Sequence, residues 1–103
     1  MSARIAIDTA RLADFCRRWK IVELALFGSV LRDDFRPDSD VDMLVTFAPD
    51  SHVTLFDMVH MEDELSRLLG RKADLVSRRG VERSPNYIRR KAILSSTEVV
   101  YAS

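Results

Sequence analysis

The sequence predicts an α/β (α+β) fold, a small mixed β-sheet with helices packed mainly on one of its sides. Short apolar stretches of strand length alternate with amphipathic stretches of helical length, and this alternation is typical of helices layered on a sheet. The chain has 103 residues, of which 47% are hydrophobic and 31% are charged. A chain of this length supports one hydrophobic core. We therefore expect a single domain over residues 1–103.

The first helix is expected to start at Asp8 or Thr9, because either residue can act as an N-cap, and to run to about Lys20. Its apolar residues follow the i, i+3, i+4, i+7 spacing of one helical face: Leu12, Phe15, Cys16 and Trp19. An apolar stretch of strand length follows over residues 21–27 and ends at a glycine. The chain is thus expected to begin with a helix that packs on its first strand.

The middle of the chain contains a connection, a strand and the longest helix. Residues 30–33 are expected to form a short helical turn, and residues 34–39 a polar loop. The second strand covers 41–47, and a helix over about 53–69 ends at Gly70. The buried stripe of this helix is expected to consist of Met58, Met61, Leu65 and Leu68.

The last third is expected to form a strand over 73–77, a helix from Ser84 to about Leu94, and a final strand over 98–101. Ser84 followed by Pro85 indicates a helix start, because serine caps helices and proline fits the first helical position. The predicted order is helix, strand, short turn, strand, helix, strand, helix, strand.

Composition and charge exclude several classes of protein. The apolar runs are too short to span a bilayer, and the N-terminus lacks the apolar segment of a signal peptide. Cys16 is the only cysteine, which excludes an internal disulfide and indicates a reducing compartment. We therefore expect a cytoplasmic protein without membrane association. The net charge is zero, −5 in residues 1–70 and +5 in residues 71–103. Direct nucleic-acid binding is not expected, although the basic last third offers a face to a phosphate or an acidic partner.

Three aspartates predict a metal site. Asp40 and Asp42 lie two residues apart in or beside a predicted strand, so their side chains project to the same face. Two neighbouring carboxylates repel each other unless a cation lies between them or one of them is protonated, and Mg²⁺ prefers such oxygen ligands. If the strand at 73–77 pairs beside the strand at 41–47, Asp74 faces the same pocket. Three carboxylates can hold two metal ions about 3.5–4 Å apart, an arrangement that serves phosphoryl and nucleotidyl transfer.

A second group of residues predicts a phosphate site. Gly28 and Ser29 follow a strand and precede a helical turn. Glycine lets the backbone approach a ligand closely, and a serine hydroxyl with helix-start N–H groups can hold phosphate oxygens. Arg32, one turn further on, can neutralise phosphate charge. A phosphate site and a metal site ten residues apart suit a nucleoside triphosphate with its Mg²⁺.

These motifs resemble the minimal nucleotidyltransferase family, whose members share the fold of the DNA polymerase beta palm. The family pattern is Gly-Ser, ten residues, Asp-x-Asp and a later aspartate on a neighbouring strand. The matching residues here are Phe27-Gly28-Ser29-Val30-Leu31-Arg32, then Ser39-Asp40-Val41-Asp42-Met43-Leu44-Val45, then Ala73-Asp74-Leu75-Val76. The similarity covers most of the chain, from about residue 20 to residue 101.

The resemblance implies a role for each motif. The catalytic aspartates Asp40, Asp42 and Asp74 would hold two Mg²⁺ ions, while Gly28, Ser29 and Arg32 would bind the triphosphate of ATP. Many members are antitoxins that transfer AMP from ATP onto a tyrosine of a HEPN-type ribonuclease toxin. Larger relatives hold the acceptor with an added helical domain, which about 100 residues cannot include. The resemblance therefore implies a protein acceptor and a hetero-oligomer with the toxin, and leaves a homodimer open.

Two positions depart from the family pattern and keep alternatives open. Val30 stands where members often carry a basic residue, and Asp33 stands where they often carry glycine. These departures favour an alternative in which the chain is a catalytically idle antitoxin that neutralises its partner by binding alone. A third hypothesis is a stand-alone enzyme that acts on a small molecule or an RNA end.

Overall fold

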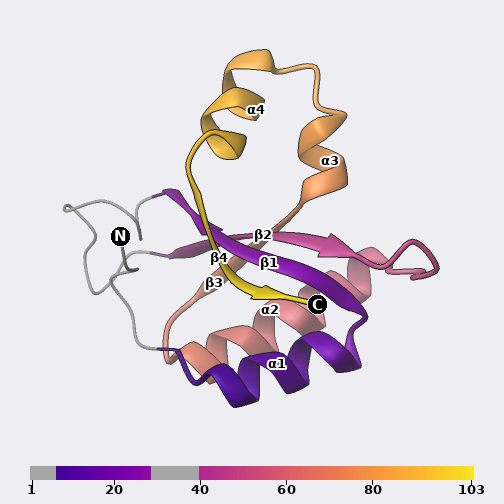
Figure 1. Cartoon of the computed structure of the whole chain (residues 1–103), viewed down its shortest axis with the longest axis vertical. Coiled ribbons are helices and arrows are strands. Elements are labelled where there is room, and N and C mark those ends of the chain that lie inside the picture. The colour runs from indigo at the N-terminus through magenta and orange to yellow at the C-terminus, as the bar shows by residue number, and fades with distance from the viewer. Residues whose placement is uncertain (1–6, 29–39) are drawn as a thin grey trace.

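The computed structural model describes residues 7–28 and 40–103. Within these residues the chain forms a four-stranded sheet in the order β3-β2-β1-β4 (Figure 1). The strands are β1 (Ile21–Phe27), β2 (Val41–Phe47), β3 (Ala73–Ser77) and β4 (Thr97–Ala102). β1 pairs antiparallel with β2 and with β4, whereas β2 and β3 are parallel. The mixed sheet and the positions of its strands confirm the sequence prediction.

Helices cover both faces of the sheet (Figure 1). The helices α1 (Thr9–Arg18) and α2 (Leu55–Leu69) pack on one face, and α3 (Arg78–Glu82) and α4 (Tyr87–Leu94) lie on the other. The expectation that helices pack mainly on one side is therefore wrong. No helix within residues 7–28 and 40–103 is long and apolar enough to cross a membrane.

Both faces of the sheet are covered by helices because its strands carry apolar side chains on both faces. Ala25 and Leu44 point away from α1 and α2 and form a second buried cluster with Val81 of α3 and Ile93 of α4. A strand that carries apolar side chains on both faces needs a cover on each. The short helices α3 and α4 supply that cover.

The larger core lies between the sheet and the helices α1 and α2. Its side chains are almost completely buried: Leu12, Phe15, Cys16, Ile21, Leu24, Leu26, Val41, Met43, Val45, Met61, Leu65, Ala73 and Leu75. Burial raises the pKa of the Cys16 thiol to about 12. Because the thiolate is the reactive form of cysteine, this thiol is a packing group rather than a nucleophile.

Polar contacts fix the two long helices to each other. Asp8 caps α1, because its Oδ1 accepts from the N–H groups of residues 10 and 11 at 3.1 Å each. At the other end of α1, Arg18 forms an ion pair with Glu64 of α2, and Trp19 Nε1 donates to Glu64 Oε1 at 3.2 Å. The Arg18 guanidinium lowers the pKa of Glu64, since it favours the charged carboxylate. One carboxylate thus links both helices.

The outer edge of the sheet is covered by side chains of α2. The N–H of Ala73 donates to Ser66 Oγ at 2.9 Å, and the N–H of Leu75 donates to Glu62 Oε2 at 2.7 Å. The helix is itself well terminated, with a capping box at Thr54 and a left-handed Gly70 at its C-terminus. These bonds satisfy edge donors that would otherwise be open to another strand, and they hold β3 in position.

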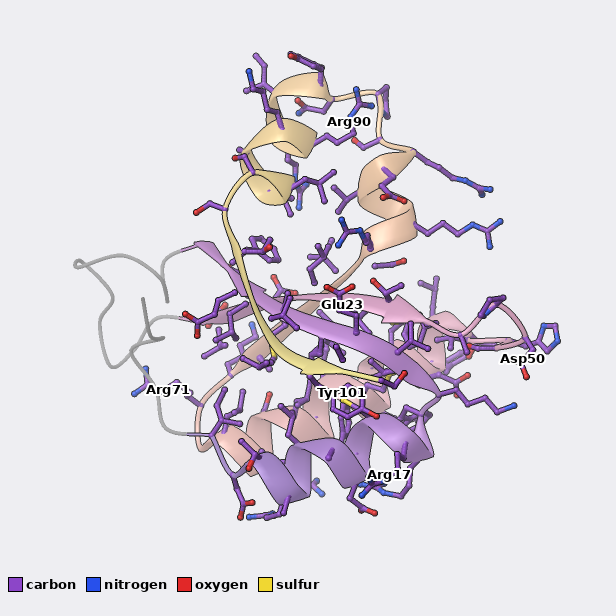
Figure 2. The ribbon with its side chains drawn as sticks, viewed as in Figure 1. Arg17, Glu23, Asp50, Arg71, Arg90 and Tyr101 are labelled. Carbon is purple, nitrogen blue, oxygen red and sulfur yellow. The ribbon has the colours of Figure 1, made fainter. Side chains whose placement is uncertain are left out.

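The last helix begins later than the sequence predicts. The N-cap of α4 is Asn86, whose Oδ1 accepts from the N–H of Arg89 at 3.0 Å. Ser84 does not cap the helix. Its hydroxyl instead accepts from the N–H of Asn86 at 3.2 Å, and its carbonyl accepts from Arg90 Nη1 at 2.9 Å. Arg90 thus lies between α3 and α4 (Figure 2) and connects the turn to the helix. Asparagine and serine are similarly good N-cap residues, and in this helix the N-cap is Asn86.

Candidate active site

Two of the predicted site residues, Asp42 and Asp74, lie directly opposite each other on neighbouring strands. The parallel register of β2 and β3 pairs Val41 with Ala73 and Asp42 with Asp74. Val41 and Ala73 are buried in the core beneath the sheet. Because successive side chains of a strand point to opposite faces, Asp42 and Asp74 share the face that carries α3 and α4. The predicted pairing of these two strands is confirmed.

Asp40 lies just before β2, two residues before Asp42 and on the same face. It forms an ion pair with Lys72, a residue that the sequence did not single out. Lys72 precedes β3, and its carbonyl accepts a hydrogen bond from the N–H of Val41 at 2.8 Å. Its Nζ lies 3.9 Å from Asp40 Oδ2. The signal for Lys72 was its place two residues before Asp74, which puts both side chains on one face once the strand is recognised.

Gly28 comes close to Asp42, since Phe27 at the end of β1 pairs with Asp42. Gly28 has φ +78°, a conformation that residues with a side chain rarely adopt. A Cβ on Gly28 would lie 2.8 Å from Asp42 Oδ2 and 3.6 Å from Asp42 Cγ. The glycine is therefore required both by the backbone conformation and by the space that the carboxylate occupies. A predicted phosphate-site residue and a predicted metal ligand thus lie in contact.

Other predicted nucleotide-binding residues cannot be placed beside these groups. Ser29 and Arg32 lie outside the described residues, as do the two departures from the family pattern, Val30 and Asp33. The structure therefore brings together Gly28 and the aspartates, and the roles of Ser29 and Arg32 stay predictions.

The donor chemistry of the site fits a hard divalent cation. Asp40 and Asp74 are exposed and Asp42 is half-buried, so the carboxylates are open to solvent. Among residues 7–28 and 40–103, no three His, Cys, Asp or Glu side chains converge closely enough to hold a metal ion. Mg²⁺, however, is commonly bound by one or two carboxylates together with water and substrate phosphates. Two carboxylates that face each other across neighbouring strands repel, and a cation would relieve this repulsion.

A groove of about 620 Å³ lies at the opposite end of the sheet. It is bordered by the end of β2, the start of α2 and the start of α3, and its lining includes Phe47, Met58 and Arg79. Figure 2 labels Asp50, which follows β2, and Arg71, which precedes β3, at the two ends of the sheet. The carboxylates lie at the Arg71 end. Among the predicted site residues that the structure describes, Gly28, Asp40, Asp42 and Asp74, none lines this groove, so we do not assign the nucleotide to it.

Comparison with known proteins identifies the family of the domain. The family model of the nucleotidyltransferase domain matches residues 11–99. This chain belongs to the nucleotidyltransferase domain family. The nucleotidyltransferase is also 37% identical over 71 residues to the protein adenylyltransferase MntA of Thermococcus cleftensis, an alignment that covers 69% of this chain and 70% of that protein. It spans 63% of a Methanocaldococcus jannaschii relative that is provisionally named a protein adenylyltransferase, at 31% identity. The predicted family and enzyme class are confirmed.

Solved structures resemble the nucleotidyltransferase over most of its length. A structure provisionally described as a minimal nucleotidyltransferase is 35% identical, with a TM-score of 0.65 over 86% of this chain and 85% of that one. A toxin–antitoxin crystal structure with AMP-PNP has a TM-score of 0.71 at 17% identity and covers 94% of this chain and 75% of that one. A third, a tri-AMPylated Shewanella oneidensis HEPN toxin in complex with an MNT antitoxin, has a TM-score of 0.62 at 18% identity, over 92% and 70% of the two chains. The last two show the fold alone, and the predicted nucleotidyltransferase fold is confirmed.

Proposed function

We propose that this nucleotidyltransferase is the antitoxin of a toxin–antitoxin pair and transfers AMP from ATP to a tyrosine hydroxyl of a HEPN-type ribonuclease toxin. The observation that carries the proposal is that Gly28 lies beside Asp42, which in turn lies opposite Asp74. It puts a backbone that can approach phosphate beside two carboxylates that can hold a cation. Relatives that are named protein adenylyltransferases, and fold neighbours in complex with toxins, support the choice of acceptor.

Different residues of this chain bind the triphosphate, bind the metal and accept the proton. Gly28, with Ser29 and Arg32, binds the triphosphate, and Asp40 and Asp42 are the ligands for Mg²⁺. When bound, Mg²⁺ supplies the alignment of acceptor and phosphate and stabilises the leaving pyrophosphate. Asp74 lies on the terminal strand β3 and its side chain is exposed, and it accepts the proton of the acceptor hydroxyl.

The reaction is balanced without any other reactant. The tyrosine oxygen forms a bond to the α-phosphorus of ATP, and the bond from that phosphorus to the β-phosphate oxygen breaks. Pyrophosphate leaves with the electron pair of this bond, and the tyrosine proton passes to Asp74. The carboxylates differ in exposure in a way that suits these roles, because Asp42 is half-buried beside Gly28, whereas Asp74 is exposed.

Intact-mass spectrometry of the cognate toxin tests the proposal. The toxin is incubated with this protein, ATP and Mg²⁺, and a mass gain of one or more AMP units is expected. The Asp42→Asn variant should give no gain, because one ligand is lost while the side chain keeps its shape. Asp63→Asn is the matched control, since Asp63 is an exposed carboxylate of α2 paired with Arg67 at 2.8 Å.

The outcomes separate the alternatives. A stable complex without mass gain would replace the proposal by an antitoxin that acts through binding alone. If neither a complex nor a mass gain is found, the acceptor is not this class of protein. Localisation of the modified residue by peptide fragmentation then decides whether tyrosine is the acceptor.

A further inference from the structure

Lys72 brings a positive charge to the row of carboxylates at the candidate site. The residue lies opposite Asp40 at the start of the parallel pair, because Val41 is in register with Ala73. Its Nζ lies 3.9 Å from Asp40 Oδ2. One carboxylate, of Asp40, and one ammonium, of Lys72, therefore lie just before β2 and β3, next to the opposed pair of Asp42 and Asp74.

The position of Lys72 is fixed by its backbone rather than by its side chain alone. Its carbonyl accepts from the N–H of Val41 at 2.8 Å. The residues that follow are anchored on their other edge to α2, through Ser66 Oγ and Glu62 Oε2. The Lys72 side chain is 75% exposed, whereas its backbone is held beside the site. An exposed ammonium on a fixed backbone can leave one anionic partner and contact another.

The ion pair engages one of the three carboxylates of the candidate site. Asp40, Asp42 and Asp74 share a face, yet within the described ranges they do not form a group of three able to hold a metal. Asp40 directs Oδ2 toward Lys72. While this contact exists, that oxygen is paired with an ammonium.

We propose that Lys72 is a resident counter-ion of the site, which occupies Asp40 in the metal-free protein and competes with a divalent cation for that carboxylate. The proposal rests on the proposed function for the assignment of a metal to the aspartates. Binding of the cation displaces the ammonium, and Asp40 turns toward Asp42. Lys72 is thus a positioning residue that sets the cation concentration at which the site fills.

An ion pair elsewhere in the chain provides the matched control. Lys20 Nζ lies 3.9 Å from Asp50 Oδ2, the same distance as in the Lys72 pair, and both partners are exposed. Asp50 lies at the other end of the sheet (Figure 2). Lys20→Met removes one positive charge and one exposed ion pair from the protein but none from the carboxylate row. It therefore measures the effect of net charge alone.

Titration calorimetry with Mn²⁺ alone, on the nucleotide-free protein, tests the competition. An exposed ion pair contributes up to about 1 kcal/mol, which corresponds to about a fivefold change in an equilibrium constant. Lys72→Met is therefore expected to lower the Mn²⁺ dissociation constant by up to about fivefold. Lys72→Arg, which keeps the charge, and Lys20→Met are expected to leave it unchanged. The rise of the melting temperature with added Mn²⁺ should begin at a lower concentration in Lys72→Met.

Three results would overturn the proposal. The first is a Lys72→Met variant that binds Mn²⁺ no more tightly than the wild type. The second is an equal tightening in Lys20→Met, because net charge would then explain the effect. The third is a wild type that binds no Mn²⁺, which would also remove the metal from the proposed function. If Lys72→Met binds more tightly but no AMP is transferred, the counter-ion role stands and the proposed activity alone fails.

Discussion

Replacement of Gly28 by alanine separates the placement of Asp42 from general stability. Gly28→Ala adds a methyl group at 2.8 Å from Asp42 Oδ2, whereas ordinary contact begins at 3.4 Å. The carboxylate oxygen must therefore retreat by about 0.6 Å, the difference between these distances. Gly70→Ala is the control, since Gly70 has φ +72° against +78° for Gly28, and nothing lies within 4 Å of its Cβ position.

The two variants share one cost and differ in another. A left-handed conformation costs a residue with a side chain about 1–2 kcal/mol, and this applies to both glycines. Gly28→Ala also turns Asp42 away from its preferred rotamer, at about 0.5–1.5 kcal/mol. We therefore expect Gly70→Ala to lose about 1–2 kcal/mol and Gly28→Ala about 1.5–3.5 kcal/mol in the free energy of unfolding. Chemical denaturation with matched m-values measures both.

The two variants should differ much more in the rate of AMP transfer than in the free energy of unfolding. Displacement of a reacting group by about 1 Å can cost about a hundredfold in rate, so a shift of about 0.6 Å in a proposed metal ligand should cost tenfold or more. AMP transfer, measured by intact mass at equal fractions of folded protein, should fall in Gly28→Ala and persist in Gly70→Ala. Full activity in Gly28→Ala, with a stability equal to that of Gly70→Ala, would refute the idea that this contact positions Asp42 for catalysis.

Three further predictions test the site and the contacts that support it. Asp74→Asn should abolish AMP transfer while the metal-free protein is as stable as the wild type or more stable, because like charges opposite each other on neighbouring strands are unfavourable. Transfer assays and thermal denaturation check this, and retained transfer would exclude Asp74 from catalysis. The pKa of Glu64 is lowered by Arg18, so its contribution is present above the unfolded-state pKa and disappears as pH falls through the lower folded-state pKa. Glu64→Gln should therefore be less stable than the wild type at pH 7, and the gap should close below about pH 4.5; a gap that does not change with pH would contradict this. Asn86→Ala should cost about 1 kcal/mol by loss of the cap, and circular dichroism melts should show a smaller loss for Ser84→Ala if Asn86 is the cap.

Three of the four strands could be predicted because each shows two signals, an apolar stretch and a boundary at its ends. The stretches at 21–27, 41–47 and 73–77 are apolar, and each is bounded by glycine, proline or charged residues. The structure places β1, β2 and β3 at these residues. The face shared by Asp42 and Asp74 then follows from the two-residue period, once the strands are known to pair. The shared face of these two aspartates could therefore be predicted once the strands were predicted.

The parts that could not be predicted depend on contacts between distant segments. The helix α3 has five residues, too few to show a helical period, and it contains Gly80. The cap at Asn86 competes with Ser84, and both are good capping residues. The second covered face depends on Ala25 and Leu44 meeting α3 and α4, which no local pattern shows. Lys72 reads as an ordinary surface lysine until the register places it opposite Asp40.

The unfavourable features of the chain concentrate at the candidate site, and the core explains why the fold tolerates them. The opposed pair of Asp42 and Asp74 costs about 0.2–1 kcal/mol. A one-residue slip of β3 would separate the two carboxylates, but it would also turn Leu75 and Ala73 from the core to the other face. Loss of burial for one leucine costs about 1.5–3 kcal/mol, and the bonds from α2 to the edge of β3 would be lost as well. The buried face of β3 therefore holds the repelling carboxylates together, so the apolar core is what assembles the candidate site.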